Sequence, residues 1–170
     1  MPDRTPTNTK NLDRYGSDAI PWSRAHDELA KGESVFFVGT VDSDNRPHVA
    51  GVGVAWFDGD LYFTSNLGSL KARNLAANPA ATMAASLAGI DLTLEGTVEQ
   101  VGDTAILERI AGIYRNGSWP AEVAGDALTA PYSAPSAGPP PWHVFRFTFD
   151  TVVGVATAEP YGATKWQFAR

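Results

Sequence analysis

The most informative stretch of this sequence is Leu61-Tyr-Phe-Thr-Ser-Asn-Leu-Gly-Ser-Leu-Lys-Ala-Arg-Asn-Leu-Ala-Ala-Asn-Pro79. Residues 61–65 are rich in aromatic and branched side chains, which favours a β-strand. A short polar turn follows. Ser69 is a suitable N-cap, because its hydroxyl can accept a hydrogen bond from a backbone N–H two or three residues later. A helix that begins there must end before Pro79. The stretch therefore predicts a strand, a turn and a short helix.

The start of this helix has the features of an anion site. Lys71 and Arg73 lie in or near its first turn, and Asn74 follows. Cations are locally unfavourable at a helix N-terminus, whereas the unpaired N–H groups and the helix dipole attract anions. A bound anion, most readily a phosphate group, would explain the two cations. An ordinary solvated helix start on a surface loop would explain them too, and the spacing leaves both interpretations open.

Two further strands are predicted directly before this stretch. Ser34–Val41 and Pro47–Phe57 are rich in branched and aromatic residues, and Asp58-Gly59 indicates a tight hairpin. Strands joined by such short turns pair in antiparallel order. The alternation of side chains places Gly51 and Gly53 on one face of the second strand. This small, flat surface suits a planar ring, although a bend in a barrel or packing between sheets would also account for it.

The rest of the chain predicts more strand than helix. We expect a flexible N-terminal arm over residues 1–20 and a single domain over residues 21–170. Within that domain we expect a helix over 24–31 capped by Ser23, strands over 80–87 and 91–101, a helix from Thr104 to about Tyr114 capped by Asp103, and strands over 142–149 and 151–157. Residues 117–141 predict an irregular loop, and a role as lid, partner contact or disordered segment stays open.

These elements predict a mainly β fold with helices (α+β). The expected architecture is an antiparallel split barrel of the Greek-key type, with about six or seven strands and about three helices over its ends. With 170 residues the chain is long enough to bury a substantial core without disulfides.

The composition excludes several classes of function. The formal net charge of −6 argues against nucleic-acid binding through bulk charge, and no apolar run is long enough to cross a membrane. The polar N-terminus lacks the apolar core of a signal peptide, so we expect a cytoplasmic protein. The chain contains no cysteine, and its three histidines lack the spacing of metal ligands. We therefore expect no metal, and no catalytic acid, base or nucleophile can be named.

Several segments resemble one known superfamily. "LYFTSN" and "GSLKARNLAANP" are similar to the cofactor-binding segment of the pyridoxamine 5′-phosphate oxidase-like split-barrel superfamily, which includes FMN enzymes and F420-dependent reductases. The preceding "GTVDSDNRPHVAGVGVAWFDGDLYF" resembles the hairpin before that segment, and "GATKWQF" resembles the closing segment. The resemblance covers residues 30–100 well and residues 115–141 poorly. It implies an oxidoreductase that uses FMN or F420 to transfer hydride to or from a small organic substrate.

The resemblance also implies which residues bind the cofactor. Lys71 matches the phosphate-binding lysine of the superfamily, Ser65 a hydroxyl residue that reaches the phosphate, and Ser69 the start of the same loop. Lys165 and Trp166 match a segment that reaches the cofactor ring from a partner subunit, since the site lies at a homodimer interface; for Trp166 a plain core or interface role stays open. The full candidate set is Gly51, Gly53, Thr64, Ser65, Ser69, Lys71, Arg73, Asn74, Lys165 and Trp166.

The sequence departs from the superfamily pattern in two places. Leu70 replaces an arginine that many relatives carry beside the lysine, which weakens the expected grip on phosphate. Val49 and Val54 stand on a strand that carries basic residues in the vitamin B6 oxidases, which argues against oxidation of pyridoxamine phosphate itself. A non-catalytic flavin- or haem-binding protein of the same fold is the alternative function. A dimeric scaffold whose 117–141 loop binds a protein partner is a third.

Overall fold

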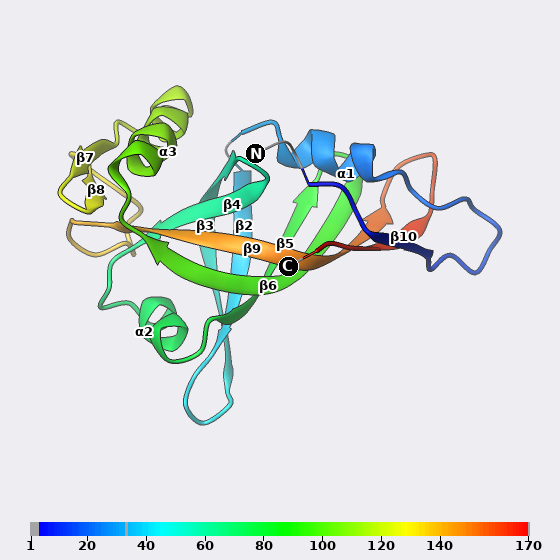
Figure 1. Cartoon of the computed structure of the whole chain (residues 1–170), viewed down its shortest axis with the longest axis horizontal. Helices are drawn as coiled ribbons and strands as arrows, with labels where there is room; N and C mark the ends of the chain where they lie inside the picture. Colours follow the sequence, from blue (N-terminus) through cyan, green and yellow to red (C-terminus); the bar gives the residue numbers. More distant parts are fainter. Residues whose placement is uncertain (1–3, 33, 170) are drawn as a thin grey trace.

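A computed structural model of the chain describes residues 4–32 and 34–169. Within these ranges the chain forms three helices and ten strands (Figure 1). In chain order these are β1 (Asn8–Asn11), α1 (Trp22–Leu29), β2 (Ser34–Val41), β3 (Pro47–Phe57), β4 (Asp60–Ser65), α2 (Leu70–Ala77), β5 (Ala80–Leu87), β6 (Ile90–Val101), α3 (Thr104–Asn116), β7 (Glu122–Ala124), β8 (Ala127–Thr129), β9 (His143–Ala156) and β10 (Ala163–Gln167).

Six of the strands close into an antiparallel barrel in the order β9-β4-β3-β2-β5-β6, and β6 pairs with β9 to complete the circle. The long strand β9 pairs with β4 near its start and with β10 near its end, so β1 and β10 extend the sheet beyond the barrel. Figure 1 shows α3 and the β7–β8 hairpin at one end of the molecule and β1 and β10 at the opposite end. The predicted mainly β barrel with three helices is confirmed.

Side-chain alternation explains why these strands curl around one core. Phe145, Phe147 and Phe149 point from β9 into the barrel interior, where each is buried. Burying a side chain of this size contributes about 1.5–3 kcal/mol. The opposite face of the sheet carries a second core beneath α3, to which Tyr62 and Val144 contribute. The middle of β4 is therefore buried on both faces, which explains why Leu61, Tyr62 and Phe63 are consecutive apolar residues.

The expected N-terminal arm differs from the structure. Asn8–Asn11 forms β1 and pairs with β10, and the Arg4 guanidinium donates hydrogen bonds of 2.6 Å to the backbone oxygens of Phe149 and Ala169. Arg4 also lies 3.6 Å from Asp60, whose pKa burial raises above its ordinary value. The strand was not predicted because its side chains are all polar and exposed, so it lacks the apolar alternation of a half-buried strand. Residues 1–3 lie outside the described ranges, and the boundary at residue 20 stays a prediction.

Three smaller expectations also need correction. Helix α1 begins at Trp22 with Pro21 as N-cap and without a side-chain cap, so the predicted cap at Ser23 is wrong. The two strands expected after residue 141 are one strand, β9, because its pairing with β6 resumes after Asp150, which the register of the two strands skips between Glu95 and Gly96. The 117–141 loop contains the short β7–β8 hairpin. None of the helices in the described part of the chain is long and apolar enough to cross a membrane.

Candidate functional site

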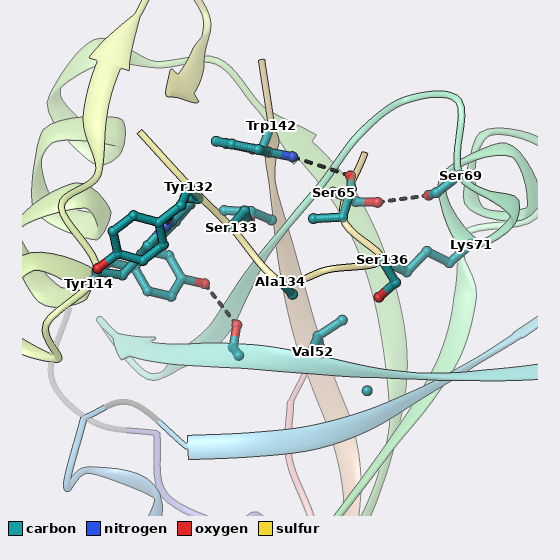
Figure 2. A pocket seen from close by; sticks show the side chains of 15 residues that line it. Val52, Ser65, Ser69, Lys71, Tyr114, Tyr132, Ser133, Ala134, Ser136 and Trp142 are labelled. Carbon is teal, nitrogen blue, oxygen red and sulfur yellow. Dashed lines mark hydrogen bonds between the residues drawn. The ribbon is translucent and has the colours of Figure 1, made fainter. Parts of the chain in front are cut away.

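A cavity of about 360 Å³ lies beside the outer face of β3, between α2 and the end of α3 (Figure 2). The end of β4 and the segment after β8 complete its walls. Its lining residues are Gly51, Val52, Gly53, Thr64, Ser65, Ser69, Lys71, Tyr114, Trp119, Tyr132, Ser133, Ala134, Ser136, Ala137 and Trp142. Six of the predicted site residues thus meet in one cavity: Gly51, Gly53, Thr64, Ser65, Ser69 and Lys71.

Gly51 and Gly53 form the floor of this cavity. Gly51 and Gly53 share one face of β3 as predicted, and because their neighbours Val52 and Val54 are buried in the barrel core, that face is the outer one. The Tyr114 hydroxyl donates a 2.8 Å hydrogen bond to the Gly53 carbonyl and so ties the floor to α3. A Cβ added to Gly51 would meet only the Phe37 ring, at an ordinary contact distance of 3.7 Å. The fold itself therefore does not require glycine at this position, whereas a ring bound on the floor would.

This observation makes Gly51→Val a test of the floor. We expect the variant to fold with unchanged or slightly higher stability, because valine is favoured in strands and glycine weakens them. Binding of any planar ligand in the cavity should fall at least about tenfold, because a side chain would occupy the contact surface. Thermal unfolding and ligand fluorescence measure the two effects. Ligand binding that is unchanged in Gly51→Val would place the ring elsewhere.

The start of α2 contributes two linked hydroxyls. The Ser69 hydroxyl accepts a 3.2 Å hydrogen bond from the Ala72 N–H, which confirms Ser69 as the N-cap. It also lies 2.7 Å from the Ser65 hydroxyl, which in turn lies within 3.1 Å of the Asn66 carbonyl. The last residue of β4 is thus joined to the first turn of α2, and both hydroxyls line the cavity.

Lys71 is the charged residue of the site. In Figure 2 its side chain extends from α2 toward the segment that carries Ser136. It is half-buried, and burial lowers the pKa of its ammonium group below the ordinary 10.5. Among the described residues Lys71 makes no side-chain hydrogen bond or ion pair, and no other charged side chain lines the cavity. A cation that is partly removed from water without a counterion favours an anionic ligand.

The sequence matches the model of a known protein family over most of its length. The model described as "Pyridoxamine 5′-phosphate oxidase" matches residues 23–156, which include the barrel strands β2 to β6, β9 and most of the cavity. The chain belongs to the pyridoxamine 5′-phosphate oxidase family. A search among curated proteins found no match.

Solved structures of the pyridoxamine 5′-phosphate oxidase fold resemble this chain over most of its length. An F420 reductase is 23% identical with a TM-score of 0.51, covering 75% of this chain and 94% of its own. An FMN-binding protein from Nostoc punctiforme is 17% identical (TM-score 0.55; 91% and 93%). A haem-binding protein from Mycobacterium smegmatis is 15% identical (TM-score 0.60; 86% and 58%). At these identities the similarity shows the fold alone.

Two predicted contacts of the family's phosphate segment do not reach the cavity. Arg73 is exposed, because two residues along a helix correspond to a rotation of about 200° away from Lys71. Asn74 is buried and its amide donates a 3.1 Å hydrogen bond to the Thr40 hydroxyl. Asn74 therefore holds α2 against β2 and does not line the site. Both residues are structural or surface positions within this chain.

The C-terminal candidates also lie away from the cavity of their own chain. Trp166 is fully buried in the barrel core at the β10 end, with its ring 5.4 Å from the ring of Trp22. It packs so closely over Gly154 that a Cβ there would lie 2.7 Å from the indole. This burial supports the core interpretation of Trp166 over contact with a cofactor ring. Lys165 is partly exposed, and a contact from a partner subunit stays a prediction.

Sequence reasoning missed the wall formed by the 117–141 loop. Its residues 132–137 form a further wall of the cavity, in which Ser136 lies next to Lys71 in Figure 2. Two indole groups hold this segment: Trp119 donates to the Tyr132 carbonyl at 2.7 Å, and Trp142 to the Ala137 carbonyl at 3.3 Å. The Asn66 amide adds a 2.9 Å bond to the Pro139 carbonyl. The family resemblance is weakest in this loop. Its serine and tryptophan side chains, which can donate hydrogen bonds, are the one local sign of a polar wall held by side chains.

Proposed function

We propose that this protein is an oxidoreductase that binds FMN or F420 in the cavity and passes hydride to or from a small organic substrate. The observation that carries the proposal is Lys71, a half-buried ammonium group without a counterion among the described residues, next to a floor of two glycines. A phosphate group would supply the missing charge, and the floor would accept the flat ring to which that phosphate is joined.

Each part of the cavity has a role in this proposal. When bound, the cofactor ring supplies the redox chemistry. Lys71 and the N-cap Ser69 would hold the phosphate, while Gly51 and Gly53 allow the backbone to approach the ring. On the far side Trp119 contacts Tyr114 edge-on and Trp142 at a tilt, with ring centroids 5.1 and 5.7 Å apart. This aromatic wall would keep water from one edge of the ring.

The relatives support a flavin-type ligand without selecting one. One structural neighbour is named an F420 reductase and another an FMN-binding protein. A single lysine beside two hydroxyls suits the phosphate of either cofactor. Oxidation of pyridoxamine phosphate stays disfavoured, because the outer face of β3 carries Val49 in place of a basic residue.

A non-catalytic binding protein is the second candidate. No carboxylate or histidine is found among the described residues that line the cavity, so the chain itself offers only Lys71 and two tyrosines as titratable groups there. A carrier needs no more than this. One neighbour is named a haem-binding protein, but no histidine that could ligate iron is found among the described residues of the cavity wall.

Ligand titration tests the proposal. Purified protein is titrated separately with FMN and F420 while ligand fluorescence is followed, and we expect binding of one of them at micromolar concentrations. Turnover with nicotinamide donors, or with reduced F420, then separates the enzyme from the carrier. Absence of binding to both ligands would refute the proposal.

We also propose that the protein works as a homodimer with the ligand near the interface. Val35 and Phe37 of β2 and Val49 of β3 are 69%, 55% and 62% exposed. They lie on the same outer face as Gly51 and Gly53, since Val35 pairs with Gly53, Phe37 with Gly51 and Gly39 with Val49. An exposed apolar patch of this kind marks an interaction surface. Because it continues into the cavity floor, a second copy covering it would also enclose the ligand.

Phe37→Glu tests the dimer. A carboxylate at the centre of the patch would be buried without a partner, so we expect the variant to sediment as a monomer at concentrations where the unmodified chain sediments as a dimer. Tyr15→Glu is the matched control, because Tyr15 is an exposed aromatic residue in the segment between β1 and α1 and belongs to neither strand of the patch. A monomeric unmodified protein, or a dimer that Phe37→Glu leaves intact, would disprove the proposed interface.

A further inference from the structure

The hydroxyls on the α2 side of the cavity cannot surround a phosphate group by themselves. Ser65 and Ser69 carry one donor hydrogen each, and the 2.7 Å bond between their oxygens uses one of the two. If Ser65 donates to the Asn66 carbonyl, 3.1 Å away, Ser69 donates to Ser65 and no hydroxyl hydrogen is left for a ligand. If Ser65 donates to Ser69 instead, the Ser69 hydrogen is free to reach a ligand. The pair therefore offers a ligand one hydrogen at most. Among the side chains on this side only the Lys71 ammonium adds further donors to the cavity, and the Leu70 side chain adds none.

The opposite wall carries two further hydroxyls. Ser133 and Ser136 line the same cavity, and within the described ranges neither side chain has a hydrogen-bond partner. The backbone that carries them is held in place, because Trp119, Trp142 and Asn66 donate to its carbonyls and Ala137 N–H closes a turn onto the Ala134 carbonyl. Their hydroxyls are thus positioned by the segment and remain available to a ligand.

We infer that Ser133 and Ser136 form the second half of the phosphate site and take the place of a second cation. This inference rests on the proposed function, and it adds that the ligand's phosphate lies between α2 and the segment 132–137. The phosphate oxygens together accept from Lys71 and Ser69 on one side and from the two loop hydroxyls on the other. Such a site carries one positive charge and several neutral donors. The 132–137 segment is then a binding element of this chain, and not a docking site for a protein partner.

The experiment compares ligands with and without the phosphate. Affinities of the unmodified protein, Ser133→Ala, Ser136→Ala and the double variant are measured by fluorescence for FMN against riboflavin, and for F420 against its deazaflavin chromophore without the phosphate. We expect the double variant to bind the phosphate-bearing ligand about tenfold more weakly, because hydrogen bonds to a charged group are lost. The affinity for the ligand without the phosphate, riboflavin or the deazaflavin chromophore, should change less than about twofold.

Two further variants serve as controls for this experiment. Ser136→Thr retains a hydroxyl and should restore most of the affinity that Ser136→Ala loses. Ser43→Ala lies in the exposed turn between β2 and β3 and should change nothing. If the double variant binds the phosphate-bearing ligand as tightly as the unmodified protein while Lys71→Ala does not, the inference is wrong and the proposed function survives. If the unmodified protein binds none of the four ligands, both the inference and the proposed function are wrong.

Discussion

Lys71→Ala is expected to lower the affinity for the phosphate-bearing cofactor by about 1.5–3 kcal/mol, the contribution of a hydrogen bond to a charged group. This corresponds to roughly 10- to 150-fold in the dissociation constant. The effect should be large because Lys71 is the one charged side chain among the described residues that line the cavity. Binding of riboflavin should fall much less, since it lacks the phosphate. Fluorescence titration of both ligands measures the difference.

Arg73→Ala is the matched control for this prediction. Arg73 lies two residues further along the same helix, carries the same charge and is exposed outside the cavity. Its removal changes the net charge as Lys71→Ala does, so a general electrostatic effect would weaken binding equally in both variants. Equal losses, or no loss in Lys71→Ala, would remove Lys71 from the proposed site.

The same lysine should make stability depend on pH when no ligand is bound. Burial lowers the pKa of Lys71 in the folded protein, so the unfolded chain binds the proton more tightly. Between the lowered pKa and 10.5 the unfolded state holds more protons, and stability therefore rises with pH across that window. Lys71→Met should be more stable than the unmodified protein at neutral pH and lack this rise. Urea unfolding at several pH values would measure it, and parallel curves for the two proteins would contradict it.

Trp166→Ala is expected to reduce the free energy of unfolding by about 3–5 kcal/mol, the range for large-to-small changes of buried aromatic residues. The indole is fully buried, contacts Trp22 edge-on and fills the space that Gly154 leaves open. No neighbour can move in easily, because this end of the core is built from other large rings. Denaturant unfolding measures the loss.

Two companion variants separate a core role from a ligand-contact role. Trp166→Phe keeps part of the ring and should lose less stability, and Lys165→Ala, with a partly exposed side chain, should stay within about 0.5 kcal/mol. If Trp166→Phe instead keeps full stability and loses cofactor affinity, Trp166 contacts the ring and its assignment to the core is wrong.

Local patterns in the sequence predicted the central part of the molecule. The alternation predicted that Gly51 and Gly53 share one face of β3, and Ser69 predicted the start of α2, because both depend on neighbouring residues only. The resemblance then brought these two elements together in one site. The resemblance also implied contacts from Arg73 and Asn74, which do not line the cavity. A motif match does not fix the direction of each side chain around a helix.

The remaining parts depend on contacts between distant segments. Ser133 and Ser136 are held at the site by side chains that donate to backbone carbonyls of the loop, one of them from Asn66 to a residue 73 positions away, and no local pattern predicts such a bond. Strand β1 likewise consists of polar residues that any turn could contain. For Trp166 the sequence allowed a core position or a ligand contact, and only the three-dimensional neighbourhood favours the first.

The closing pair of the barrel, β6 with β9, has a consequence for how this scaffold can change. Everything between these strands, from α3 to the segment 132–137, leaves the barrel at Val101 and returns at His143. The length and composition of this excursion can vary while the strand pairing stays the same, because long surface insertions cost little loop entropy. New ligand preferences can therefore be acquired, or grafted by a designer, by exchanging one contiguous piece of chain.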